Sequence, residues 1–179
     1  YLLGPDFPDQ RWMQWNGRYR DDMRGFLRGE DGLTASVMQR LQGSPDLFDE
    51  PMRSVNFLTA HDGFTLYDLV AYDRKHNEAN GWNGSDGTDD NRSWNCGWEG
   101  DVGVPEDVMV LRRRQLRNAM CLLLLSHGVP MFAAGDEFIG NPDLVVGAGA
   151  GRKVIADGFG EAERLGVEGA LLGVGVRHD

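Results

Sequence analysis

The side chains best suited to chemistry are an adjacent histidine and carboxylate, His61 and Asp62. They follow an apolar, β-prone run at residues 55–60 and precede Gly63. A buried strand that ends in this way places functional groups at its carboxyl end. A carboxylate held there can accept hydrogen bonds from sugar hydroxyls or stabilise a developing cation, and a histidine can donate a hydrogen bond beside it. A polar turn that merely ends a strand explains the same dipeptide, so the rest of the chain has to decide between the two interpretations.

A second apolar run, at residues 129–135, also ends in acids, Asp136 and Glu137. These acids could face a site, but we favour a structural role in which they pair with a nearby arginine. Helical patterns separate the two apolar runs, which predicts parallel strands joined through helices and therefore an α/β fold. A complete (β/α)8 barrel typically needs about 250 residues, and this chain has 179. We therefore expect part of such a barrel.

Capping and breaking residues bound the helical patterns. The first predicted helix begins after Asn16 and ends at Gly29. Its predicted apolar face consists of Trp15, Tyr19, Met23, Phe26 and Leu27. Further helices are predicted at residues 33–41, 64–71 and 105–127. Pro105 suits the first turn of the last helix, and Gly128 is placed to close it.

The last predicted helix carries an arginine cluster, made of Arg112, Arg113, Arg114 and Arg117. Such a cluster could bind phosphate. In an acidic chain, a solvated face with local carboxylate partners is the better interpretation. Residues 73–104, before this helix, form a polar stretch with three tryptophans, which predicts an ordered functional loop rather than a disordered one.

The composition excludes several classes of protein. The formal net charge is −10, so nucleic acid and anionic membrane surfaces are poor partners. Two cysteines and four scattered histidines give no metal-ligand spacing, and nothing indicates a cofactor. We expect free thiols in a reducing cytoplasm, and no apolar run of about 18 residues predicts a membrane span. Because the chain begins at Tyr1, we expect a fragment or a processed product.

Several linked motifs resemble one enzyme family. They are WNGRYRD at 15–21, VNFLTAHDGFT at 55–65, DLVAYDRKHNEANG at 68–81, DDNRSWNCG at 89–97, LRRRQLRN at 111–118 and LSHGVPMFAAGDE at 125–137. In this order they resemble the bacterial glycogen debranching enzymes of the isoamylase type, within the α-amylase superfamily (glycoside hydrolase family 13). The resemblance covers residues 1–138 and implies the C-terminal βα units of a catalytic TIM barrel.

The resemblance also implies roles for single residues. Asp62 corresponds to the third catalytic carboxylate, a transition-state stabiliser, and His61 to a substrate contact. The implied reaction is hydrolysis of α-1,6 branch points in glycogen or limit dextrin, with retention of configuration. The nucleophile and the acid/base belong to motifs that this chain lacks, so we expect the chain alone to be inactive. In the tryptophan loop, Trp94 and Asn91 are candidate contacts for the branched glucan, although Trp94 could instead pin the loop to the fold.

Two further interpretations stay open. The chain could be a non-catalytic glucan-binding remnant, or it could derive from a related trehalose-forming α-glucan hydrolase. The debranching motifs at 77–80 and 94–97 argue against the latter. The glycine-rich tail, residues 139–179, does not continue the family pattern, and we expect it to be a divergent or frameshifted extension without function.

Overall fold

The structure is a computed structural model that describes residues 3–7, 9 and 11–138. The tail predicted to be divergent, residues 139–179, lies outside the described residues. In the described part, three short parallel strands form one sheet in the order β1 (Gln14–Trp15), β2 (Ser54–Phe57) and β3 (Val129–Met131). Because all three strands run the same way, their carboxyl ends meet at one edge. The predicted α/β class with parallel strands is confirmed.

The central strand, β2, pairs on both sides. Val55 is in register with Trp15 on one side and with Val129 on the other. Strand β2 therefore has no unpaired edge. Both predicted strands are shorter than expected, since β2 ends at Phe57 and β3 at Met131. Strand β1 was not predicted, because two residues are too few to show an alternating pattern.

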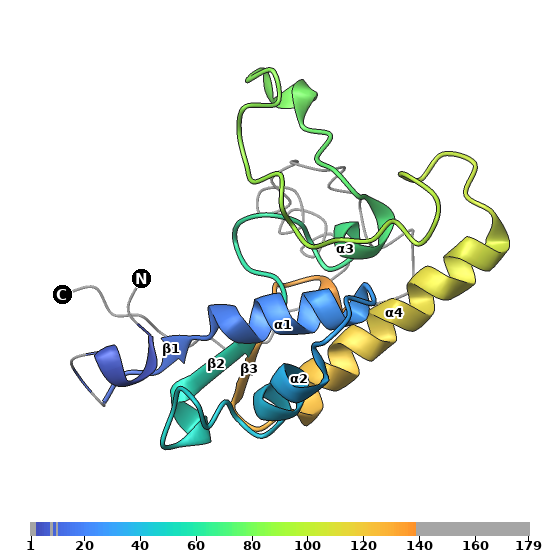
Figure 1. Ribbon diagram of the computed structural model, residues 1–179. Coiled ribbons are helices and arrows are strands. Elements are labelled where there is room, and N and C mark those ends of the chain that lie inside the picture. Colours follow the sequence, from blue (N-terminus) through green and yellow to red (C-terminus); the bar gives the residue numbers. More distant parts are fainter. Residues whose placement is uncertain (1–2, 8, 10, 139–179) are drawn as a thin grey trace, which may run out of the picture.

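The described residues form four α-helices: α1 (Gly17–Leu27), α2 (Thr34–Leu41), α3 (Asp68–Ala71) and α4 (Glu106–Leu125). Four short 3₁₀ turns complete the described elements: η1 (Gly4–Asp6), η2 (Pro51–Arg53), η3 (Glu78–Asn80) and η4 (Asp136–Phe138). Helix α1 contacts β2, α2 and α4, and α3 contacts α4. Figure 1 shows α1 and α4 crossing beside the sheet, whereas the loop that follows α3 extends away from it.

The predicted helix boundaries follow from the capping residues. The side-chain oxygen of Asn16 accepts a hydrogen bond from the backbone N–H of Tyr19 at 2.9 Å, which caps α1. Pro105 is extended and directly precedes α4. After α4, Gly128 has a φ of 128°, and a Cβ there would lie 2.6 Å from the side-chain nitrogen of Asn56. A glycine is thus required where the turn into β3 passes close to β2.

The core lies between α1, α3 and α4. The side chains of Tyr19 and Met23 are fully buried and pack with Leu116 and Leu123 of α4. The Tyr19 hydroxyl donates to the carbonyl of Leu122 at 2.9 Å. The predicted apolar face of the first helix was wrong at two of its five positions. Trp15 belongs to β1, and both Trp15 and Phe26 are exposed.

The arginines of α4 do not form one solvated face. Arg113 pairs with Glu106 at 2.5 Å, and Arg114 and Arg117 are exposed, as predicted. Arg112, however, is fully buried, so the prediction was wrong at this position. Its Nη2 lies within hydrogen-bond distance of four backbone carbonyls, those of Ala71, Asn95, Trp98 and Gly100. The arginine thereby fastens the returning end of the long loop to α4.

Candidate active site

His61 and Asp62 lie just beyond β2, at the edge where the three strands end. Both residues are exposed and occupy a bend that closes at Gly63, whose φ is +71°. The His61 ring lies 5.7 Å from the ring of Trp15, and the Trp15 ring lies 5.5 Å from that of Phe57. Trp15, the last residue of β1, therefore lies beside both the histidine and the last residue of β2. This is the position that the sequence predicts for a site at the carboxyl edge of a parallel sheet.

Asn91 contacts this bend from the protein interior and not from the solvent side. Its side-chain oxygen accepts a hydrogen bond from the backbone N–H of Phe64 at 3.1 Å, and its side-chain nitrogen donates to the carbonyl of Thr88 at 3.0 Å. The residue is 3% exposed. Both ends of the amide are thus engaged within the protein. The structure brings Asn91 next to the bend that carries Asp62, but it does not present the amide to solvent.

Arg24 is a site residue that sequence reasoning missed. It projects from α1 and is 7% exposed. Its Nε donates to the carbonyl of Leu58 at 2.7 Å, and its Nη1 donates to the carbonyl of Asn91 at 3.0 Å. Burial, and then the charge of Arg20, lower the pKa of Arg24 to about 10, whereas nearby carboxylates, among them Asp62, oppose the shift. The sequence offered one signal for this residue: Arg24 directly follows Met23, which belongs to the predicted apolar face of the first helix.

Asp136 joins the segment after β3 to the end of β2. Its carboxylate accepts hydrogen bonds from the hydroxyl of Thr59 at 2.6 Å and from the backbone N–H of Ala133 at 3.1 Å. Burial raises the pKa of Asp136, although these hydrogen bonds oppose the shift. A structural role was predicted correctly, but the predicted arginine partner was wrong, since a hydroxyl and a backbone amide take its place.

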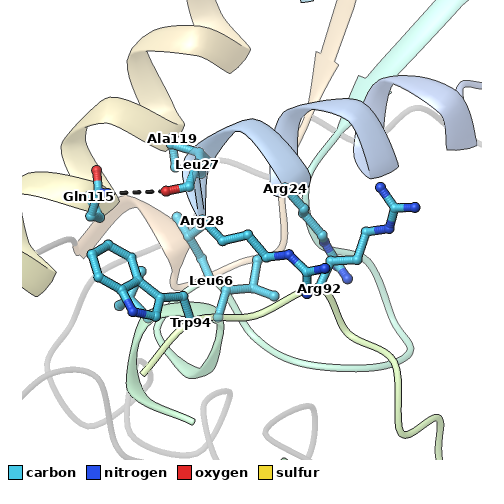
Figure 2. A pocket seen from close by; sticks show the side chains of 10 residues that line it. Arg24, Leu27, Arg28, Leu66, Arg92, Trp94, Gln115 and Ala119 are labelled. Carbon is cyan, nitrogen blue, oxygen red and sulfur yellow. Dashed lines mark hydrogen bonds between the residues drawn. The ribbon is translucent and has the colours of Figure 1, made fainter. Parts of the chain in front are cut away.

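The three loop tryptophans differ in their surroundings. Trp94 is half-buried against the core, and its backbone N–H donates to the carbonyl of Leu69 at 2.9 Å. Its indole lines a small pocket with Leu66, Ala119 and Gln115, which Figure 2 shows together with Arg24, Arg28 and Arg92. The indole N–H of Trp98 donates to the carbonyl of Val102 at 3.1 Å. Trp82 is 68% exposed, so among these three it offers the largest open ring surface.

No group of three or more histidine, cysteine, aspartate or glutamate side chains in the described ranges is arranged to hold a metal ion. Within the same ranges, no helix combines the length and the apolar character needed to cross a membrane. Cys96 and Cys121 are both free. The candidate site therefore consists of the exposed His61–Asp62 bend and the buried groups that support it.

Comparison with known proteins gives three informative relatives. The chain is 53% identical over 141 residues to a Mycobacterium bovis protein named glycogen operon protein GlgX homolog, covering 76% of this chain and 19% of that protein. It is 49% identical over 143 residues to the chloroplastic isoamylase 3 of Oryza sativa subsp. japonica, covering 77% and 18%. It is also 49% identical over 142 residues to a glycogen debranching enzyme of Serratia proteamaculans, covering 76% and 21%.

The chain therefore spans about a fifth of the length of these curated relatives. No family model matches it. Among solved structures, a pullulanase from Anoxybacillus sp. LM18-11 superposes with a TM-score of 0.51 at 23% identity, covering 87% of this chain and 20% of that one. This structural likeness concerns the fold alone.

Proposed function

We propose that this chain supplies part of the active site of an α-1,6-glucan hydrolase. Over about three quarters of its length, the chain is a homologue of isoamylase-type glycogen debranching enzymes. The observation that carries the proposal is the exposed His61–Asp62 bend at the carboxyl edge of a parallel sheet. The substrate would be branched α-glucan, either glycogen or limit dextrin, because two of the relatives are named for glycogen.

The chemistry assigned to the bend follows from the charge that develops during glycosidic cleavage. The transition state has oxocarbenium character, and in a retaining enzyme two carboxyl groups about 5 Å apart act as nucleophile and acid/base. Asp62 would act as a third carboxylate, which accepts hydrogen bonds from sugar hydroxyls that strengthen as the ring distorts. The neighbouring His61 would donate a hydrogen bond to an adjacent hydroxyl. Both side chains are exposed, as substrate contact requires.

The nucleophile and the acid/base would come from outside this chain. At the carboxyl edge of the sheet, Asp136 is committed to Thr59 and to the backbone, which leaves Asp62 as the exposed carboxylate directly after β2. The three described strands would be the C-terminal part of a (β/α)8 barrel within residues 1–138, completed by the much longer remainder seen in the relatives. On this proposal the chain has no hydrolytic activity by itself.

The long loop, residues 73–104, would contribute to glucan binding through one exposed tryptophan and two more buried residues. Trp82 has an open ring face against which a sugar ring can lie. Trp94 and Asn91 are more buried, and we assign them a supporting position behind the contact surface. The cytoplasmic location, and the absence of nucleic acid among the partners, remain predictions from the cysteine content and the net charge of −10.

The test is product analysis on a longer protein in which residues 1–138 are completed by the rest of the barrel, because the chain alone is expected to be inactive. A debranching hydrolase releases linear chains from glycogen limit dextrin and leaves unbranched amylose intact. Release of linear chains from the branched substrate alone is the expected result. Binding of glycogen without turnover would favour a non-catalytic glucan-binding protein, and release of trehalose would favour the trehalose-forming alternative.

A further inference from the structure

We propose that Arg24 and Asn91 act together as a brace that positions the bend carrying His61 and Asp62. Only the expected effect of the brace on substrate turnover rests on the proposed function. The brace itself is a geometric claim about three segments: helix α1, the bend after β2 and residues 88–92 of the long loop. Neither residue of the brace needs to touch substrate.

Asn91 holds the bend from its C-terminal side. The backbone N–H of Phe64, two residues after Asp62, donates to the Asn91 side-chain oxygen at 3.1 Å. The fit is close, because a Cβ at Gly63 would lie 2.8 Å from that same oxygen. The Asn91 nitrogen is fixed in turn by the carbonyl of Thr88. The amide therefore has one orientation, in which its oxygen faces the bend.

Arg24 holds the bend from its N-terminal side and connects it to the same asparagine. One guanidinium nitrogen donates to the carbonyl of Leu58, the first residue after β2, and another donates to the carbonyl of Asn91. Figure 2 shows the Arg24 side chain extending from α1 toward the loop that carries Arg92. Arg92 reinforces this attachment by donating to the carbonyl of Asp21 in α1 at 3.1 Å.

These contacts matter because the bend itself has little burial. His61, Asp62 and Gly63 are all exposed, so packing alone does not fix their position. Transition-state stabilisation depends on placement, and a shift of about 1 Å in a catalytic group can lower a rate by about 100-fold. Arg24 and Asn91 are both buried, and their hydrogen bonds to Leu58 and Phe64 restrain the chain before and after the exposed bend. The geometry thus assigns both residues to positioning rather than to substrate contact.

Hydrogen exchange of the bend tests the brace directly and needs no activity. We would compare deuterium uptake of peptides spanning residues 58–66 in the wild-type protein and in Asn91→Ala, Asn91→Asp and Arg24→Met. Asn91→Ala and Arg24→Met should speed exchange in these peptides by about tenfold or more, because their opening free energy falls. Asn91→Asp retains an acceptor for the Phe64 N–H but loses the N–H that donates to the carbonyl of Thr88, so its exchange should lie between that of the wild type and that of Asn91→Ala. Arg117→Met, at an exposed arginine of α4, is the matched control and should leave exchange unchanged.

Turnover of limit dextrin supplies the second readout. Asn91→Ala should lower kcat by about 10- to 100-fold with KM within about threefold, and it should have no further effect when Asp62 is already replaced by asparagine. Unchanged exchange at 58–66 in Asn91→Ala would overturn the brace. If the longer protein with the completed barrel has no turnover, the proposed function fails, and the exchange data still decide the brace.

Discussion

The hydroxyl of Thr59 lies 2.6 Å from a carboxylate oxygen of Asp136, so the chain just beyond β2 is hydrogen-bonded to the chain just beyond β3. Thr59 is 2% exposed. The bond lies three residues before Asp62, on the same side of the sheet as the candidate site. It fixes the spacing of two strand ends at the edge where the exposed histidine and carboxylate are presented.

Removal of this hydrogen bond should destabilise the protein. In Thr59→Val the side chain keeps its size, but Asp136 loses its hydroxyl donor while remaining buried. We expect the free energy of unfolding to fall by about 1–3 kcal/mol, which is the usual cost of an unsatisfied buried polar group. Urea denaturation measures the change. Thr88→Val, at an exposed threonine, is the control and should change the value by less than about 0.5 kcal/mol. Equal stabilities of the two variants would show that the bond contributes nothing.

Asp68 predicts a pH dependence of stability. Burial raises its pKa to about 7, the charges of Asp101 and Asp136 add to the shift, and hydrogen bonds with Thr65 oppose it. In the unfolded chain the group titrates near its usual 3.8. Between these values the folded state keeps a proton that the unfolded state has lost, so stability falls as the pH rises from about 4 to about 7.

The variant Asp68→Asn isolates this contribution. Each unit of pKa difference corresponds to roughly 1.4 kcal/mol, so the wild type should lose a few kcal/mol more than the variant across that range. Urea denaturation at several pH values between 4 and 7 measures both slopes. Parallel curves for the wild type and the variant would contradict the raised pKa of Asp68.

Arg112 should be among the most sensitive positions on α4. Its guanidinium is fully buried and satisfies carbonyls from two separate segments, Ala71 and residues 95–100. The change Arg112→Met preserves the apolar stem but leaves those carbonyls without a hydrogen-bond donor. We expect the free energy of unfolding to fall by about 3–5 kcal/mol. Faster hydrogen exchange at residues 94–103 should accompany it. Arg117→Met is the matched control, and similar losses in both variants would contradict the anchoring role of Arg112.

Local signals were enough to predict most helix boundaries. Asn16 caps α1, Pro105 precedes α4, and Gly128 turns the chain into β3, each through backbone chemistry that depends on a few neighbouring residues. The central strand and the exposed bend after it were also predictable, because an apolar run that ends in His61–Asp62 is a local pattern. The motif resemblance added the enzyme family, which the comparisons support at about 50% identity.

Features that depend on distant segments were not predictable. Trp15 fits the helical spacing of Tyr19 and Met23, yet it belongs to β1 because it pairs with Val55, 40 positions along the chain. Arg112 was indistinguishable from Arg113 in the sequence, since its burial depends on carbonyls that the long loop brings to it. Helix α3 is shorter than predicted, since it begins at Asp68 rather than at residue 64.

The site shows the same division between local and distant information. His61 and Asp62 are exposed at the strand ends, where the sequence places them. Arg24 was missed, because its two carbonyl partners, on Leu58 and Asn91, lie 34 and 67 positions away. Asn91 was expected at the site as a substrate contact, but its amide faces the protein. Its position followed from the motif, whereas its orientation depended on tertiary contacts.

The central claim is that Asp62 stabilises the transition state of α-1,6-glucan hydrolysis. It is tested most directly by the kinetics of Asp62→Asn on limit dextrin, in a longer protein in which residues 1–138 are completed by the rest of the barrel. We predict that kcat falls by about 100- to 1,000-fold, by analogy with the loss of other transition-state hydrogen-bonding groups. The melting temperature should stay unchanged, because the side chain is exposed. Asp31→Asn, at an exposed aspartate between α1 and α2, should keep wild-type kinetics. A kcat for Asp62→Asn within about twofold of the wild type would contradict the catalytic assignment.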